Sequence, residues 1–317
     1  MAHFPDTLAF SGILKPLRFE ADIIDVEVEG VIPPELNGTF HRVHPDQQFP
    51  PMFDNDQFFN GDGLISQFRF RGGKVDFKQR YAQTDKFKLE RAAGKALFGA
   101  YRNPLTDDPS VKGRIRGTAN TNAVVHAGKL MALKEDSPAL LMDPLTLETF
   151  GYTNWGGKCS SQTFTAHPKI DPATGELFGY AYAAKGEASD DIAVYAFDKH
   201  GKKTWEVWFK SPYPGMIHDC AISENYLILP LIPQVMSLDR IKAGGIIFQW
   251  EPSLEQKYIV IPRGGEAKDV RVFSAPNAMP GHVVNAFDDN GKLYLDLPVA
   301  LDNVFWFFPE AGGKFPP

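Results

Sequence analysis

The sequence predicts an all-β fold, most simply a β-propeller, and three observations carry that prediction. Short runs of alternating apolar and polar residues recur along the chain, separated by residues that favour tight turns. Nowhere do strands and helices alternate as in a βαβ unit. The hairpins recur at intervals of about 40 to 50 residues, the period of a propeller blade. Because WD and kelch signatures are absent from the sequence, the blades are expected to be divergent.

The hairpins share one pattern, in which Gly, Asn or Asp stands where a tight turn needs a positive φ. The predicted pairs are 68–71 with 74–78, 123–126 with 129–133, 168–170 with 177–182, 192–197 with 204–209, and 283–287 with 292–297. Helix is scarce, and only residues 84–94 and 237–243 are candidates. The 25 prolines agree with many loops and few long helices.

Composition limits the class of protein. With 317 residues, 43% of them hydrophobic, and a mean hydropathy of -0.25, the chain is a soluble globular protein with ample core. The absence of a visible linker predicts a single domain over residues 1–317. The net charge of -6 argues against a nucleic-acid partner, which would need a basic face.

The same composition predicts a cytoplasmic location. Cys159 and Cys220 are too few for a disulfide framework, which favours a reducing compartment. No basic and apolar leader opens the sequence, and no apolar run reaches the ~18 residues that cross a bilayer. The sequence therefore predicts neither a signal peptide nor a transmembrane segment.

Three histidines stand in phrases that suit a metal. His167 lies in TAHPK, His218 in MIHDC and His282 in PGHVVNAF, 51 and 64 residues apart. These separations are too long for one helix or one finger loop. A propeller could solve this problem, since the inner strand of every blade faces one axis. Neutral imidazole binds iron, copper, nickel and zinc, although spacing alone favours surface or satisfied core histidines.

The surroundings of these histidines resemble the carotenoid cleavage oxygenases, non-haem iron enzymes on a seven-bladed propeller. Further matching phrases lie at 36–42, 59–63, 117–121, 133–136 and 142–149, so the resemblance covers nearly the whole chain. Within the family, the chain is most similar to the stilbene-cleaving branch, the lignostilbene dioxygenases. The phrases RYAQTDK at 80–86 and FGAYRNPLTDD at 98–108 carry this closer similarity.

The resemblance implies a set of site residues. His167, His218 and His282 would bind Fe(II), and Glu135 would hold an iron-bound histidine by its other ring nitrogen. Phe59, Tyr101 and Lys134 would meet a phenolic substrate, with Lys134 and Tyr101 acting on its hydroxyl. From the residues alone, a core phenylalanine, a half-buried tyrosine, a surface lysine and a surface glutamate are the simpler interpretation.

The implied reaction is cleavage of the central C=C bond of a 4-hydroxystilbene by O2 to two aromatic aldehydes. The expected partners are therefore a phenolic stilbene and O2, and a homodimer is left open. A second hypothesis is cleavage of a carotenoid or apocarotenoid. A third is a non-catalytic propeller fragment whose iron site is incomplete.

The third hypothesis reflects a departure from the family pattern. The family binds iron with four histidines, and no match to the fourth follows the FWFFP phrase at 305–309. We therefore expect a chain that lacks the C-terminal blades, binds iron weakly and turns over little substrate alone.

Overall fold

A computed structural model of the chain describes residues 3–316, and their fold is mostly β. The all-β prediction is confirmed. Contacts along the chain define two compact units, Met1–Thr153 and Asn154–Pro317, which are described separately below. The sequence showed no linker at this division, and the single domain over 1–317 stays a prediction. Within residues 3–316, no helix is long and apolar enough to cross a membrane.

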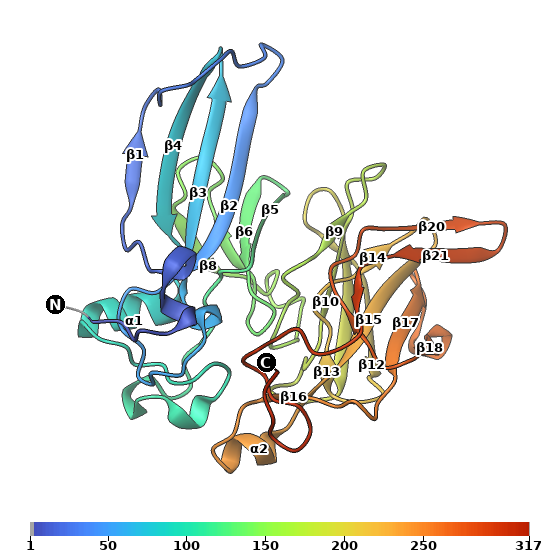
Figure 1. The fold of residues 1–317 in the computed structure, drawn as a ribbon. Coiled ribbons are helices and arrows are strands. Elements are labelled where there is room, and N and C mark those ends of the chain that lie inside the picture. The colour runs from blue at the N-terminus through green and yellow to red at the C-terminus, as the bar shows by residue number, and fades with distance from the viewer. Residues whose placement is uncertain (1–2, 317) are drawn as a thin grey trace. The chain divides into compact units, whose positions relative to one another are not determined.

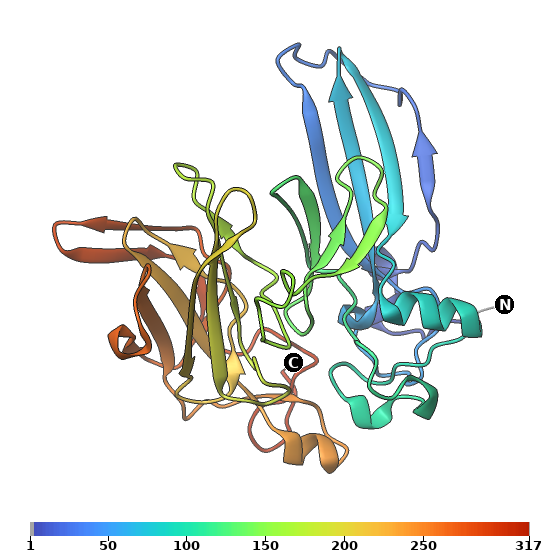
Figure 2. The ribbon, with the colours of Figure 1, turned by 180° about the vertical axis from the view of Figure 1, so that it is seen from behind.

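The first unit contains two four-stranded antiparallel sheets. In the first, β2, β3 and β4 form a meander and β1 pairs with β4, whereas the second is a simple meander, as in a propeller blade. Their strand orders are β1-β4-β3-β2 and β5-β6-β7-β8. The strands are β1 (Ala21–Ile23), β2 (Gly38–Asp46), β3 (Asp62–Arg71), β4 (Lys74–Tyr81), β5 (Asn122–His126), β6 (Lys129–Leu133), β7 (Leu140–Met142) and β8 (Thr149–Tyr152). Helix α1 (Asp85–Ala93) lies at one end of the first sheet in both views (Figures 1 and 2).

The second unit begins with a four-stranded sheet of order β12-β11-β10-β9, followed by a six-stranded sheet built around the long β15. Two strand pairs, β19-β22 and β20-β21, complete it (Figure 1). The elements are β9 (Lys169–Ile170), β10 (Leu177–Ala181), β11 (Asp191–Phe197), β12 (Lys203–Lys210), β13 (Gly215–Met216), β14 (Ala221–Ile222), β15 (Tyr226–Met236), α2 (Leu238–Lys242), β16 (Phe248–Trp250), β17 (Gln256–Pro262), β18 (Arg271–Ala275), β19 (Met279–Pro280), β20 (Asn285–Asp289), β21 (Lys292–Asp296) and β22 (Val299–Ala300).

Short 3-10 helices connect these elements. They are η1 (Leu8–Phe10), η2 (Gly12–Leu14), η3 (Phe58–Asn60), η4 (Pro104–Thr106), η5 (Pro109–Val111) and η6 (Ala267–Asp269). All five predicted hairpins are present, as β3-β4, β5-β6, β9-β10, β11-β12 and β20-β21.

Both predicted helices are confirmed, and capping residues define their ends. The Thr84 side chain accepts a hydrogen bond from the N–H of Phe87 at 3.0 Å, which caps the start of α1. Gly94 ends the helix in the left-handed conformation, with φ +69°. Ser237 caps α2 in the same way as Thr84 caps α1.

Two matching phrases of the sequence, at 59–63 and 117–121, meet in the first unit. The N–H of Gly63 donates to the carbonyl of Thr118 at 2.8 Å. A Cβ atom on Gly63 would lie 2.1 Å from the carbonyl oxygen of Ala119, so only glycine allows this approach. Buried apolar residues around Ala119 form a core that joins the two sheets.

Gly63→Ala should therefore lower the free energy of unfolding by about 3 kcal/mol or more, which is the upper end of the range typical of overpacking. The backbone of Ala119, unlike a side chain, cannot rotate away. Urea unfolding followed by tryptophan fluorescence measures the change. Gly61→Ala is the matched control, since Gly61 has φ -66° and its Cβ would meet nothing closer than 3.1 Å. Equal losses in the two variants would contradict the steric argument.

Candidate functional site

The three predicted histidines come together in the second unit. Their candidate ligand atoms all lie within 4.8 Å of one another. The Nε2 atoms of His167 and His218 are 3.2 Å apart, and the three ring centroids are separated by 4.6, 4.7 and 4.9 Å. His167 and His218 are partly buried, whereas His282 is exposed. The chain thus collects three imidazoles from segments that are remote in sequence.

The donor set fits one metal ion, and so does the spacing of His167 and His218. At a metal–nitrogen distance of about 2.1 Å, two imidazole nitrogens lie about 3.0 Å apart at a right angle and about 3.4 Å apart in a tetrahedron. The 3.2 Å between His167 and His218 falls between these values. Three imidazoles without a thiolate suit iron, copper, nickel or zinc, so the donors alone do not choose the metal.

Each histidine lies just outside a strand, and not on an inner strand as the propeller argument expected. His167 precedes β9, His218 lies between β13 and β14, and His282 lies between β19 and β20. Contacts outside the strand ladders help to fix these segments. The buried Tyr180 hydroxyl donates to the carbonyl of Ile217 at 2.8 Å, and the Cys220 thiol lies 3.4 Å from the carbonyl of His167.

Asp219 is a site residue that sequence reasoning missed. Its carboxylate lies 3.2 Å from His282 Nδ1, 2.7 Å from Lys169 Nζ and 2.9 Å from the N–H of Val283, which donates to it. Burial alone would raise the pKa of Asp219, but these contacts together hold it below the usual range. The contact at Nδ1 leaves Nε2 of His282 for a metal, which is how carboxylates orient metal-binding histidines.

A second cluster forms in the first unit around Lys134. Its ammonium nitrogen lies 5.3 Å from the ring centre of Phe59 and 4.9 Å from that of Tyr101. The two rings meet edge to face with centroids 5.9 Å apart. Lys134 is 4% exposed and also donates to the carbonyl of Phe59 at 3.2 Å. The interpretation of Lys134 as a surface lysine is wrong, because the residue is buried and its amine lies beside two aromatic rings.

Burial also changes the chemistry of this amine. Desolvation lowers the pKa of Lys134, and the nearby positive charge of Arg102 lowers it further. Asp136 and Glu135 act in the opposite direction without reversing the shift. A lowered pKa increases the neutral fraction, which can accept a proton.

Glu135 is also buried, with 6% of its surface exposed, so it is not the ordinary surface glutamate that the residues alone suggest. The other histidines behave as structural or surface residues. His41 Nε2 donates to the carbonyl of Pro144 at 2.7 Å, His44 shares strand β2, and His126 ends the edge strand β5. His3 and His200 are exposed.

A family model described as "Retinal pigment epithelial membrane protein" matches residues 14–314. The chain belongs to the carotenoid cleavage oxygenase family. Its structural neighbours are the propellers of this family. The crystal structure of Pseudomonas brassicacearum lignostilbene dioxygenase superposes with a TM-score of 0.97 at 48% identity, over 100% of this chain and 66% of that one.

Similar family members include lignostilbene-alpha,beta-dioxygenase isozyme III of Sphingomonas paucimobilis, which is 57% identical over 99% of this chain and 64% of its own length. Isoeugenol monooxygenase of Pseudomonas nitroreducens is 49% identical over 90% of this chain and 60% of its own. The chain therefore spans less than two thirds of the length of these carotenoid cleavage oxygenases.

Asp219→Asn should weaken the binding of a divalent metal to the three histidines by about 10- to 100-fold, the usual effect of losing a carboxylate that orients a ligand. Asparagine keeps an oxygen for the N–H of Val283 but removes the charge that faces His282 and Lys169. Titration of the protein with Zn²⁺, a redox-inert probe, measures the affinity.

Asp191→Asn is the control for that titration. Asp191 is a buried carboxylate of the same unit, and its ion-pair partners are Lys185 and Lys210, at 3.0 Å each, rather than the histidines. If both variants lose the same affinity, the effect reports general destabilisation and the orienting function of Asp219 is wrong.

Proposed function

We propose that the polypeptide to which these 317 residues belong is a non-haem Fe(II) dioxygenase that cleaves the C=C bond of 4-hydroxystilbene-type phenols. The observation that carries this proposal is the buried amine of Lys134, which lies over the rings of Tyr101 and Phe59. A buried amine with a lowered pKa beside aromatic rings suits a phenol, which offers an acidic hydroxyl and a flat face.

The relatives favour the same substrate class. Their names point to lignostilbene and isoeugenol, and both compounds carry a 4-hydroxyphenyl ring conjugated with a C=C bond. A carotenoid has no phenol, so Lys134 would have no evident partner in the carotenoid-cleaving alternative.

His167, His218 and His282 would hold the iron, and Asp219 would fix the ring of His282. Bound Fe(II) supplies the activation of O2. The chain's own residues prepare the substrate. Phe59 packs against the phenol ring, and neutral Lys134 accepts the proton of the 4-hydroxyl while Tyr101 donates a hydrogen bond to the same oxygen.

The reaction balances without a further reductant. Deprotonation by Lys134 places negative charge on the phenol oxygen, and conjugation carries that electron density into the alkene. The C=C bond and the O–O bond break, two C=O bonds form, and Lys134 returns its proton when the phenol product leaves. The products are two aldehydes, each with one oxygen atom from O2.

In the complete polypeptide, Lys134→Met should lower kcat for 4-hydroxystilbene by roughly ten- to a hundredfold, because a charge-assisted contact with a phenolate is worth about 1.5–3 kcal/mol. Methionine keeps the apolar volume of the stem. Steady-state rates with trans-4-hydroxystilbene and trans-4-methoxystilbene measure the effect. The methoxy compound cannot ionise and should be poor for the wild type and little changed by the substitution. Equal wild-type turnover of the two compounds would exclude phenol activation.

The rate should also depend on pH in a defined direction. Because burial lowers the pKa of Lys134, its neutral form accumulates at a lower pH than for a lysine in water. The rate should therefore rise with pH and level off below the ordinary lysine pKa of about 10.4. Lys134→Met should remove this rise, and a wild-type rise that survives in the variant would assign the titration to another group.

Labelled oxygen separates a dioxygenase from a monooxygenase, the two reaction types named among the relatives. Turnover under 18O2, with immediate reduction of the aldehydes to alcohols, should place one labelled atom in each product. Mass spectrometry of both alcohols measures the incorporation. Aldehydes incubated in labelled water and reduced in the same way control for exchange. Label in only one product would favour the monooxygenase stoichiometry.

A further inference from the structure

Residues 97–101 form a loop whose backbone is held by side chains. Five consecutive N–H groups each donate to a side-chain oxygen, at 2.8–3.1 Å. The acceptors are Glu90 Oε1 for Leu97 and Phe98, Asp107 Oδ1 for Gly99, Thr106 Oγ1 for Ala100, and Asp56 Oδ1 for Tyr101. Tyr101 is the last residue of this loop, so these acceptors help to fix the position of its ring.

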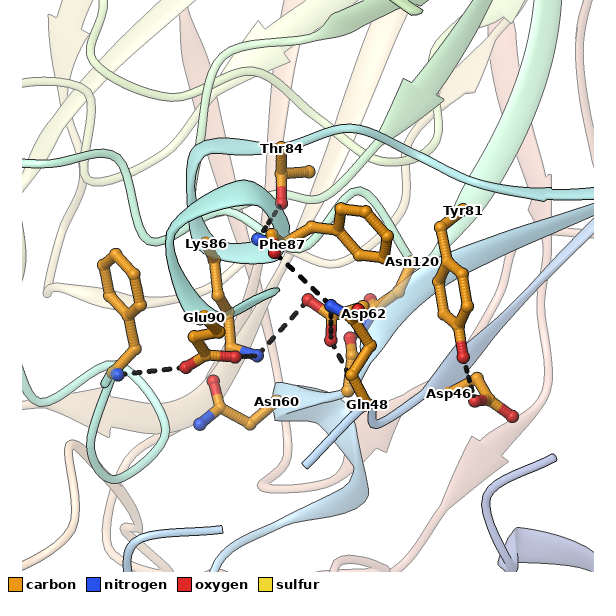
Figure 3. Close-up of polar contacts among 12 residues, drawn as sticks. Asp46, Gln48, Asn60, Asp62, Tyr81, Thr84, Lys86, Phe87, Glu90 and Asn120 are labelled. Atoms are coloured by element: carbon orange, nitrogen blue, oxygen red, sulfur yellow. Dashed lines mark hydrogen bonds and ion pairs between the residues drawn. The ribbon is translucent and has the colours of Figure 1, made fainter. Parts of the chain in front are cut away.

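Glu90 is the acceptor with two of these contacts, and a buried cation holds it in place. Glu90 lies on α1 and is 2% exposed. Lys86, one helical turn earlier and 1% exposed, lies 2.8 Å from Glu90 and 3.3 Å from Asp62. Figure 3 shows the Lys86 side chain ending between these two carboxylates. Burial opposes the charge on Lys86, but the two carboxylates raise its pKa above the usual value.

Asn60 links the same loop to Phe59. Its side-chain amide donates to Asp56 Oδ2 and to the carbonyl of Gly99, both at 2.8 Å. Asp56 in turn accepts the N–H of Tyr101. The loop has no room to shift near Gly99, since a Cβ there would lie 2.2 Å from Thr106 Oγ1. The network therefore connects both aromatic residues of the Lys134 cluster.

We propose that Glu90, held by Lys86, is a positioning residue for the phenol site, which fixes the 97–101 loop and through it the hydroxyl of Tyr101. This inference rests on the proposed function, because it assigns the network to recognition of a 4-hydroxyl. A hydrogen bond to that group requires the Tyr101 oxygen to be held at a defined place, and a misplacement of 1 Å can cost about a hundredfold in rate. The inference predicts that discrimination between phenol and methyl ether depends on Glu90.

The main variant is Glu90→Ala, which removes the acceptor for Leu97 and Phe98. Glu90→Gln keeps an oxygen for those two N–H groups and serves as the rescue variant. Tyr81→Phe is the matched control. It removes a buried hydrogen bond of the same unit, 2.5 Å from the Tyr81 hydroxyl to Asp46, and Asp46 is not one of the acceptors that hold the 97–101 loop.

Two measurements on the 317-residue chain test the inference. Fluorescence titration gives the dissociation constants of trans-4-hydroxystilbene and trans-4-methoxystilbene. The constant of the methoxy compound divided by that of the hydroxy compound measures recognition of the hydroxyl. Hydrogen exchange followed by mass spectrometry gives the protection of residues 97–101. We expect Glu90→Ala to reduce the ratio by about two- to tenfold, the contribution of one hydrogen bond to binding, and to speed exchange in the 97–101 loop. Glu90→Gln should keep most of both properties, and Tyr81→Phe should keep both while lowering the melting temperature.

The inference is overturned if the ratio of dissociation constants is unchanged in Glu90→Ala, or if it falls by the same factor in Tyr81→Phe. If the wild type does not distinguish the two stilbenes, the proposed function fails instead, and the exchange data still decide whether Glu90 holds the loop. If Glu90→Ala does not fold, Gly99→Ala displaces the loop without altering the ion network. An unchanged ratio in a folded Gly99→Ala protein would then overturn the inference.

Discussion

The first unit depends on one buried cation, the ammonium group of Lys86 between Asp62 and Glu90. Burying a carboxylate is costly unless a charge or several donors face it, and removing one partner leaves the other uncompensated. Here the ammonium lies 2.8 Å from Glu90, whose carboxylate also accepts two backbone N–H groups of the following loop. The Lys86 ammonium therefore connects helix α1 with strand β3 and, through Glu90, with the 97–101 loop.

The second unit uses the same principle near its histidines. Asp219 is nearly inaccessible, and Lys169 together with a backbone N–H makes its charge tolerable. The carboxylate can then face His282 and set its orientation. In both units a buried carboxylate accepts a backbone N–H of a segment outside the strands.

Much of this could be predicted from the sequence. Turn glycines, the Thr84 cap and the alternating runs indicate the hairpins and α1 directly, because local conformation determines them. The phrases around His167, His218 and His282 marked the three imidazoles that meet. Asp219 was missed although it follows His218, since its contact with His282 joins residues 63 apart in sequence. The buried network around Lys86 was also missed, because a helical lysine and glutamate four residues apart usually form a solvated pair.

Lys86 and Lys134 show why burial alone does not define the chemistry of a side chain. Both amines are nearly inaccessible, yet the pKa of Lys86 is raised and that of Lys134 is lowered. Two carboxylates contact the first amine directly, whereas two aromatic rings and a carbonyl surround the second. Lys86 therefore keeps its proton and supports the fold. Lys134 loses its proton more readily than a lysine in water, which is the property that the proposed activation of a phenol requires. In the proposed site, the charge of Lys86 helps to hold Tyr101, whose ring lies beside the Lys134 amine.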